Sequence, residues 1–366
     1  MKTCASQVPF PKNKIPFYEG ASITVGAAML LLAIFATKHN LVGDSMQQLL
    51  QIIAFFLPNG HKLCTSLHSF KIFFRNLKNP MKYHYYCPFC LGGVSDNTKL
   101  HCPNDFCSKS FEKIKIPYFL EMPVVDQLKS FFSQEGFFES LKHRFERHSV
   151  SGKIGDIYDG NLYKKYVENA GPLSKQENVS FTLNTDGAPV FKSSKMSIWP
   201  IFLVINELPF KIRVKKENMI LGGLWFGSQK PAMGTFLKPL YETMAILQNG
   251  IELQSPGQKG NFICRAFLLC ATADLPARSL LCNSIQYNGA YGCWKCFQTG
   301  ETAKIGKGHV THIFPFNEIS PKGPKRTSDL VLNDAKKVVY NQSIGSKNII
   351  INGVKGPTWL SFFPDV

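Results

Sequence analysis

VSFTLNTDG, at residues 179–187, is the first of several short apolar runs separated by Gly, Pro and Asn. SIWPIFLVI follows at 197–205 and NMILGGLWFG at 218–227, and their β-branched and aromatic content favours strands. The apolar spacing over 236–247 indicates a helix, and FICRAFLLCATAD at 262–274 is typical of a strand buried inside a sheet. We therefore predict a mixed α/β core with the element order β-β-β-α-β.

Two aspartates stand at the ends of these predicted strands. Asp186 follows VSFTLNT, and Asp274 follows FICRAFLLCATA. In a β-β-β-α-β sheet the two strand ends can lie side by side, and carboxylates held there can share Mg²⁺ ions that promote attack on a phosphodiester. Simpler interpretations stay open, because Asp-Gly is a common turn and Asp-Leu-Pro can cap a helix.

The composition limits the domain number and the partners. A chain of 366 residues that is 44% hydrophobic can form two or three domains, which excludes collagen, a simple coiled coil and wholesale disorder. Lys and Arg exceed Asp and Glu by 42 to 25, a formal net charge of +17. This excess favours polyanions, most simply nucleic acid, with membrane headgroups as the alternative. Neither a GxSxG elbow nor an HExxH helix occurs, so hydrolase and protease functions have no support.

The cysteines are grouped in a way that suits metal binding. Their count of eleven is odd, and three close pairs account for six of them, which favours a reducing compartment over a secreted disulfide framework. We therefore predict an intracellular protein, nuclear or cytoplasmic, that is not secreted.

The first group of cysteines has the spacing of two zinc knuckles. It consists of Cys87, Cys90, Cys102 and Cys107. Two short pairs can place four soft ligands at tetrahedral corners with little chain to order, so we predict a structural Zn²⁺ site. His84 and His101 flank the group, and either could replace a cysteine as the fourth ligand. The alternative is four unrelated buried thiols.

A second candidate Zn²⁺ site lies further along the chain. Its ligands would be Cys293, Cys296, His309 and His312. The twelve residues between Cys296 and His309 match the familiar two-Cys, two-His spacing, although the two residues between the histidines are one fewer than usual. A redox CxxC is one alternative, and exposed histidines that bind no metal are another.

The N-terminal part is apolar and helical in pattern. Residues 21–37 are uncharged over a length just short of a membrane-spanning helix. Asp44 and Gln47 form a capping-box-like start to a second apolar segment at 45–57, and a third helix-like segment occupies 63–77. Adjacent apolar helices can bury each other, so we predict a three-helix unit with no membrane contact. A membrane span at 21–37 is the alternative.

Residues 126–175 are polar, basic and helix-prone, with phenylalanines that form an apolar face. Lys142, Arg144 and Arg147 make this stretch basic. We expect a solvated helix packed on its phenylalanines, with a linker or a DNA-facing helix as alternatives. After Thr299 we expect a basic, loop-rich chain.

Longer stretches resemble a known family. They are FTLNTDGAPVFKSSKMSIWPIFLVINELPF at 181–210, LGGLWFGSQKPAMGTFLKPL at 221–240, RAFLLCATADLPAR at 265–278 and YNGAYGCWKCFQTGE at 287–301. These stretches resemble the transposase of CACTA (En/Spm-type) DNA transposons, and most closely the animal transposase-domain proteins derived from it. The likeness extends to YHYYCPFC at 83–90 and GVKGPTWLSFFPD at 353–365, so it covers most of the chain.

The resemblance implies an RNase H-like core of the DDE type that uses Mg²⁺ or Mn²⁺ in DNA recombination. It implies transposon ends and target DNA as partners, and a homo-oligomer is a further expectation. Asp186 matches the first acidic position, in the TDG motif, and Asp274 matches the second, in a D-[LF]-P-A motif. Cys293 and Cys296 match a CxxC within an insertion before the final acidic residue.

The third acidic residue of the family has no recognisable match. In the family it lies downstream of the WLSFFPD region. The available acids are Glu301, Glu318, Asp329, Asp334 and Asp365. The resemblance therefore implies a DDE-type DNA transposase, or a truncated or domesticated relative, that binds transposon DNA and cleaves and transfers phosphodiester strands with two divalent metals. The alternative is a catalytically inactive zinc-containing protein, derived from a transposase, that binds DNA or another protein.

These observations together predict five segments. They are an N-terminal helical unit (1–80), a small zinc-ribbon-like module (81–120), a basic helical connector (121–176), the first part of an RNase H-like catalytic core (177–292), and an insertion with CxxC and HxxH in which the core is still incomplete (293–366).

Overall fold

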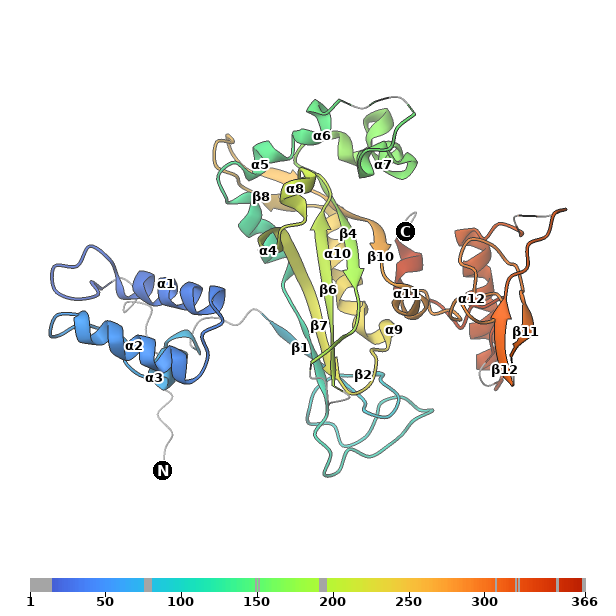
Figure 1. Cartoon of the computed structure of the whole chain (residues 1–366), viewed down its shortest axis with the longest axis horizontal. Helices are drawn as coiled ribbons and strands as arrows, with labels where there is room; N and C mark the ends of the chain where they lie inside the picture. The colour runs from blue at the N-terminus through green and yellow to red at the C-terminus, as the bar shows by residue number, and fades with distance from the viewer. Residues whose placement is uncertain are drawn as a thin grey trace. The chain divides into compact units, whose positions relative to one another are not determined.

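The computed structural model describes residues 15–75, 81–148, 150, 152–190, 196–306, 308–319, 321, 323–346 and 349–363. The chain divides into two compact units, Met1–Pro80 and Met81–Val366, which are described separately (Figure 1).

In its described residues, 15–75, the first unit contains three helices, as the sequence predicts. They are α1 (Val25–Lys38), α2 (Asp44–Phe56) and α3 (Leu67–Arg75). They pack around Met29 and Leu50, which have no exposed surface. The predicted capping box is wrong, because Gly43 is the N-cap of α2. Gln47 instead binds the start of α3, where its side chain donates to the Thr65 carbonyl at 3.0 Å and accepts from the Leu67 amide at 2.7 Å.

Burial of the first two helices is one-sided. Leu31 on α1 and Phe55 on α2 are 59% and 85% exposed, so each helix retains an apolar outer face. Within the described ranges no helix combines the length and the apolar character that crossing a membrane requires.

The second unit is built on a mixed sheet, which confirms the predicted α/β class. Its strand order is β10-β4-β6-β7-β3-β1-β2, with β5 paired to β6. β10 is parallel to β4, and the other pairings of this sheet within the described residues are antiparallel. The strands are β1 (Lys82–Tyr86), β2 (Gly93–Val94), β3 (Tyr118–Glu121), β4 (Val179–Thr185), β5 (Ala188–Pro189), β6 (Ser197–Ile205), β7 (Met219–Gly227) and β10 (Ala266–Thr272).

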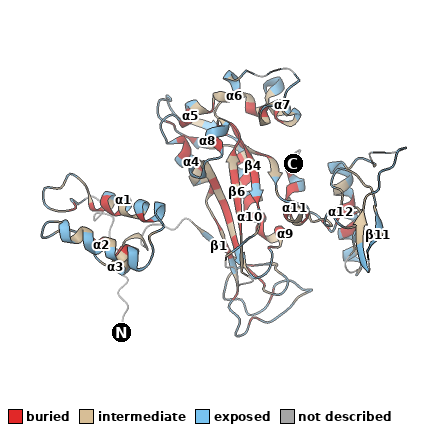
Figure 2. Cartoon of the chain, viewed as in Figure 1, coloured by how far each residue is buried: buried red, intermediate tan, exposed pale blue. Residues whose placement is uncertain are grey.

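The predicted β-β-β-α-β order corresponds to β4, β6, β7, α10 (Lys238–Asn249) and β10. Buried residues alternate with partly buried ones along β6, and β4 and β7 also contain buried residues. Figure 2 shows the buried residues of the sheet in red. α10 begins later than predicted because a separate turn, α9 (Met233–Phe236), precedes it. It packs against β10.

The long apolar run at 262–274 is two strands and not one. Phe262–Cys264 forms β9, which pairs with β8 (Ile251–Leu253), and β10 starts at Ala266. The break falls at Arg265, whose amide donates to the Asn178 side chain at 2.8 Å and whose carbonyl accepts from the Val179 amide. Asn178 therefore redirects the chain from one sheet to the next.

The connector is a series of short helices. They are α4 (Val124–Phe132), α5 (Phe137–Ser140), α6 (His143–Glu146) and α7 (Asn161–Val167), with 3₁₀ turns at Ile157–Asp159, Glu168–Ala170 and Pro172–Ser174; a further helix, α8 (Phe210–Arg213), and the turn Lys216–Asn218 join β6 to β7. Most of the predicted apolar face is buried, namely Phe131, Phe132, Phe137, Phe138 and Leu141, whereas Phe145 is 47% exposed.

Arg144 and Arg147 are not surface cations, which corrects the prediction for these two residues. Arg144 is buried, and Arg147 makes a bidentate contact with Asp159.

The chain after Thr299 is more regular than predicted. It contains the hairpin β11 (Glu301–Ile305) and β12 (His309–Ile313), the helix α12 (Ser328–Ser343) and the 3₁₀ turn Trp359–Phe362. α11 (Leu275–Leu281) follows β10 directly.

Candidate functional site

The strand register brings the ends of β4 and β10 together. These strands are parallel neighbours in which Asn184 pairs with Thr272. The Asn184 side chain also donates to the carbonyl and the hydroxyl oxygen of Thr272, both at 3.2 Å. Asp186 and Asp274 each follow two residues beyond this pair, at the carboxyl ends of adjacent strands and so at one edge of the sheet.

Local hydrogen bonds fix each aspartate. Asp186 Oδ1 accepts from the Gly187 amide at 2.7 Å where the chain turns towards β5. A Cβ on Gly187 would lie 2.5 Å from the ring of Trp199, so this turn requires glycine. Asp274 is the N-cap of α11, and its Oδ1 accepts from the Ala277 amide at 2.7 Å. Both simple interpretations, a turn and a cap, therefore describe what these residues do locally.

The same two residues retain capacity to bind a cation. Both are exposed, and in the described part of the chain no donor contacts the second oxygen of either carboxylate. Exposed carboxylate oxygens without a donor fit a hard cation with its water ligands, such as Mg²⁺.

No third carboxylate completes this pair within the residues that the structure covers. Among the described residues, the only group of three or more His, Cys, Asp or Glu side chains whose ligand atoms lie close together consists of cysteines. Glu301 lies on β11, Glu318 follows β12, and Asp329 is in the first turn of α12. Asp334 is buried and accepts from the Asn352 side chain at 3.0 Å. Asp365 lies outside the described residues.

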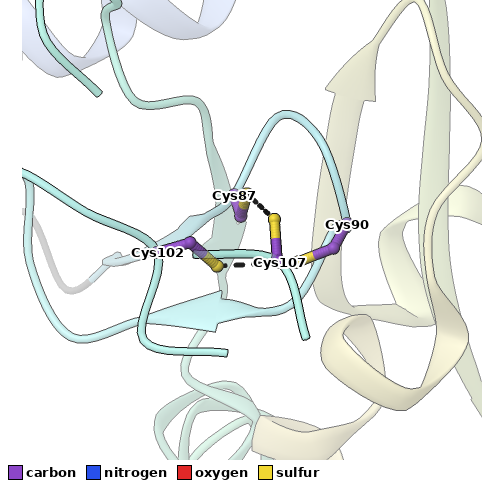
Figure 3. A group of neighbouring side chains, drawn as sticks. All are labelled: Cys87, Cys90, Cys102 and Cys107. Carbon is purple, nitrogen blue, oxygen red and sulfur yellow. Dashed lines mark hydrogen bonds between the residues drawn. The ribbon is translucent and has the colours of Figure 1, made fainter. Parts of the chain in front are cut away.

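The predicted cysteine group comes together (Figure 3). Cys87, Cys90, Cys102 and Cys107 have sulfur atoms that all lie within 4.8 Å of one another. The Cys87 and Cys107 sulfurs are 3.8 Å apart, and the Cys90 and Cys102 sulfurs are 3.6 Å apart. Four thiols at this separation could hold a metal ion such as Zn²⁺.

Turns position these four thiols. The Cys87 amide donates to the Gly92 carbonyl after β1, and the Cys102 amide donates to the Lys109 carbonyl. Burial raises the pKa of the Cys102 thiol to about 12. A divalent cation would offset this cost because it binds thiolates and displaces their protons. His84 is directed elsewhere, since its Nε2 lies 2.6 Å from Glu121 Oε2, and His101 is not part of the group.

The second predicted ligand set is not brought together. His309 and His312 are on β12, and because side chains alternate along a strand, an odd separation directs them to opposite faces. His312 Nε2 lies 2.9 Å from the Thr299 carbonyl oxygen. Cys293 and Cys296 lie before β11, where the Arg326 guanidinium donates to the Cys293 carbonyl at 3.2 Å. These four residues form no cluster of three or more ligand atoms in the described chain.

Sequence reasoning missed a buried acid at the other end of β4. Glu207 has no exposed surface and accepts from the Ser180 amide at 2.6 Å and from the Tyr163 hydroxyl at 3.1 Å. Its Oε1 lies 3.7 Å from Arg144 Nη1. Burial raises the pKa of Glu207, although Arg144 and Ser180 act in the opposite direction. The only signal in the sequence was an acidic residue two positions after the apolar strand that ends at Ile205.

Comparison with known proteins finds a family match for part of the chain. Residues 152–318 match the family model described as Transposase family tnp2, which is slightly less than half of the chain. The matched segment contains β4 to β10, both aspartates and the CxxC motif. The match supports a transposase-related function. No curated protein matches the chain.

Proposed function

We propose that the chain is a DDE-type DNA transposase of the CACTA kind, or a truncated or domesticated relative of one, with an RNase H-like core. The observation that carries this proposal is the register of β4 and β10, which puts Asp186 and Asp274 at one edge of the sheet. The family match over residues 152–318 supports it independently.

The topology also supports the proposed core. β7, β6 and β4 are successive antiparallel neighbours, and β10 is added parallel to β4 after a helix. This is the arrangement expected of an RNase H-like sheet, in which the first and fourth strands carry the first two acidic residues.

The chemistry would take place at the two aspartates. Asp186 and Asp274 would hold Mg²⁺ or Mn²⁺ through their open oxygens, and such ions activate the attacking oxygen and stabilise the leaving one in phosphodiester cleavage. The Gly187 turn and the cap of α11 would keep the carboxylates in place. The net charge of +17 would favour DNA, with transposon ends and target DNA as substrates in the nucleus, and the protein would act as a homo-oligomer.

Metal-dependent nicking of supercoiled plasmid DNA tests this function. The full chain should nick the plasmid with Mg²⁺ or Mn²⁺, and both Asp186→Asn and Asp274→Asn should lower the rate by about 100-fold or more. Glu242→Gln is the matched control, because Glu242 is an exposed acid on α10 and should leave the rate unchanged. Equal rates in all four proteins would exclude these aspartates as catalytic residues.

A second candidate is an inactive, zinc-containing DNA- or protein-binding protein derived from a transposase. The observation that favours it is that no third ligand joins the two aspartates in the described part of the chain, while the four cysteines do converge. Plasmid binding that weakens steeply with salt, without nicking under any divalent metal, would favour this candidate. Nicking that requires Asp186 would rule it out.

A further inference from the structure

Trp294 is unusually exposed. It lies between Cys293 and Cys296 and is 57% exposed, whereas Trp199 and Trp225 are 4% and 0% exposed. Its indole N–H has no acceptor among the residues that the structure describes. An exposed tryptophan ring can stack on a flat ligand.

Two cations lie against the ring of Trp294. The guanidinium carbon of Arg278 is 4.9 Å from the ring centroid, and the Lys295 ammonium nitrogen is 5.2 Å from it. Neither cation has an acidic partner within the described ranges. An exposed ring with two unpaired cations is complementary to a nucleotide, which offers a flat base and an anionic phosphate.

One of these two cations comes from the helix that begins at the candidate catalytic edge. The Arg278 amide donates to the Asp274 carbonyl at 2.8 Å in the first turn of α11. Residues four apart share one face of a helix, so the cation that contacts Trp294 is one turn from Asp274.

The backbone holds Trp294 in place. The Arg326 amide donates to the Lys295 carbonyl at 2.9 Å, and the Arg326 side chain donates to the Cys293 carbonyl. The ring therefore projects from an anchored turn, which reduces the entropy lost when a ligand stacks on it.

We propose that Trp294, Arg278 and Lys295 form a stacking site for an unpaired nucleotide of the DNA substrate, next to the phosphate at Asp186 and Asp274. This inference rests on the proposed function. Paired bases are stacked inside a duplex, so the ring accepts only a base released from pairing. The base displaces the exposed Lys295 side chain from the ring, and Lys295 and Arg278 then contact the phosphates.

Binding of two DNA probes by the full chain, without divalent metal, tests the stacking site. One probe is a duplex with an unpaired flap that carries 2-aminopurine, and the other is the same duplex fully paired. The wild type should bind the flap probe about tenfold more tightly and quench its fluorescence, because stacking of one base contributes about that factor. Trp294→Ala should bind the two probes with equal affinity, and Trp294→Phe should keep part of the preference.

Phe210→Ala is the matched control, since Phe210 is 63% exposed in α8, which lies beyond the other end of β4. It should keep the full flap preference. Wild-type binding of duplex without any flap preference, or an unchanged preference in Trp294→Ala, would overturn the stacking site while leaving the proposed function intact. Failure of the wild type to bind either probe would overturn both.

Discussion

An acidic residue lies near each end of strand β4, and the two have opposite environments. Glu207 follows β6 and lies against the start of β4, and Asp186 directly follows its end. At its start Glu207 is fully buried, and its oxygens are occupied by Ser180, Tyr163 and Arg144. At its end Asp186 is exposed, and one of its oxygens has no donor in the described chain. The difference separates an acid that stabilises the fold from an acid that remains available to a ligand.

The cysteine group is a third environment that sharpens this comparison. Cys87 and Cys102 are buried like Glu207, but their sulfurs face other sulfurs: Cys87 Sγ is 3.8 Å from Cys107 Sγ, and Cys102 Sγ is 3.6 Å from Cys90 Sγ. The Phe89 amide also donates to Cys87 Sγ at 3.4 Å. Four converging thiols could hold a cation as thiolates inside the fold, whereas the exposed aspartates would bind one at the surface.

Disrupting the proposed Zn²⁺ site should have the largest effect. We expect one Zn²⁺ per chain by elemental analysis, and Cys102→Ser should lose it and unfold the surrounding module, because structural Zn²⁺ binding in small domains contributes on the order of 10 kcal/mol. Cys296→Ser should keep the ion, since Cys296 is not part of the converged group. A protein that binds no Zn²⁺, or loses it equally in both variants, would contradict this assignment.

Breaking the buried pair should have the next largest effect. Arg144→Ala leaves Glu207 without its cation and should lower the free energy of unfolding by about 3–5 kcal/mol, measured by urea denaturation. Asp186→Asn should change it by less than about 0.5 kcal/mol. Similar losses in the two variants would show that the two ends of β4 do not differ as described.

The pH dependence of the free energy of unfolding should reveal the raised pKa of Glu207. Its pKa is raised above the ordinary value of 4.5 by burial, so the folded chain holds this proton more tightly than the unfolded chain. The stability that protonation contributes is therefore present below pH 4.5 and is lost as the pH rises towards the raised value, at up to about 1.4 kcal/mol per pH unit. Glu207→Gln should abolish this slope, and the same slope in the variant would assign it to another group.

The smallest effect should be at Asp274. Asp274→Ala removes the cap of α11 and should cost about 1 kcal/mol, whereas Asp274→Asn preserves a capping side chain and should cost only a few tenths. Thermal unfolding of the two variants measures the difference. Equal and large losses would mean that the side chain has a structural role beyond the cap.

The sequence predicted those parts of the fold that depend on local pattern. The apolar runs placed β4, β6 and β7, the order of elements placed Asp186 beside Asp274 at one edge, and the spacing of four cysteines predicted their convergence. Each of these follows from short-range periodicity or from a topology with few alternatives.

The sequence could not predict the features that depend on distant partners. Arg144 was assigned to a basic surface because nothing near it in the chain indicates its contact with Glu207. Spacing alone assigned His309 and His312 to one metal site, because the twelve residues after Cys296 match a two-Cys, two-His pattern. The strand that forms there directs the two histidines to opposite faces. The exposure of Trp294 likewise depends on packing that no local pattern records.

Binding of Mn²⁺ tests the central claim most directly, because it requires no DNA sequence and no turnover. Electron paramagnetic resonance of the full chain titrated with Mn²⁺ should show bound ion in the wild type and in Glu242→Gln. Asp186→Asn and Asp274→Asn should each lose that population. Unchanged Mn²⁺ binding in both asparagine variants would contradict the account.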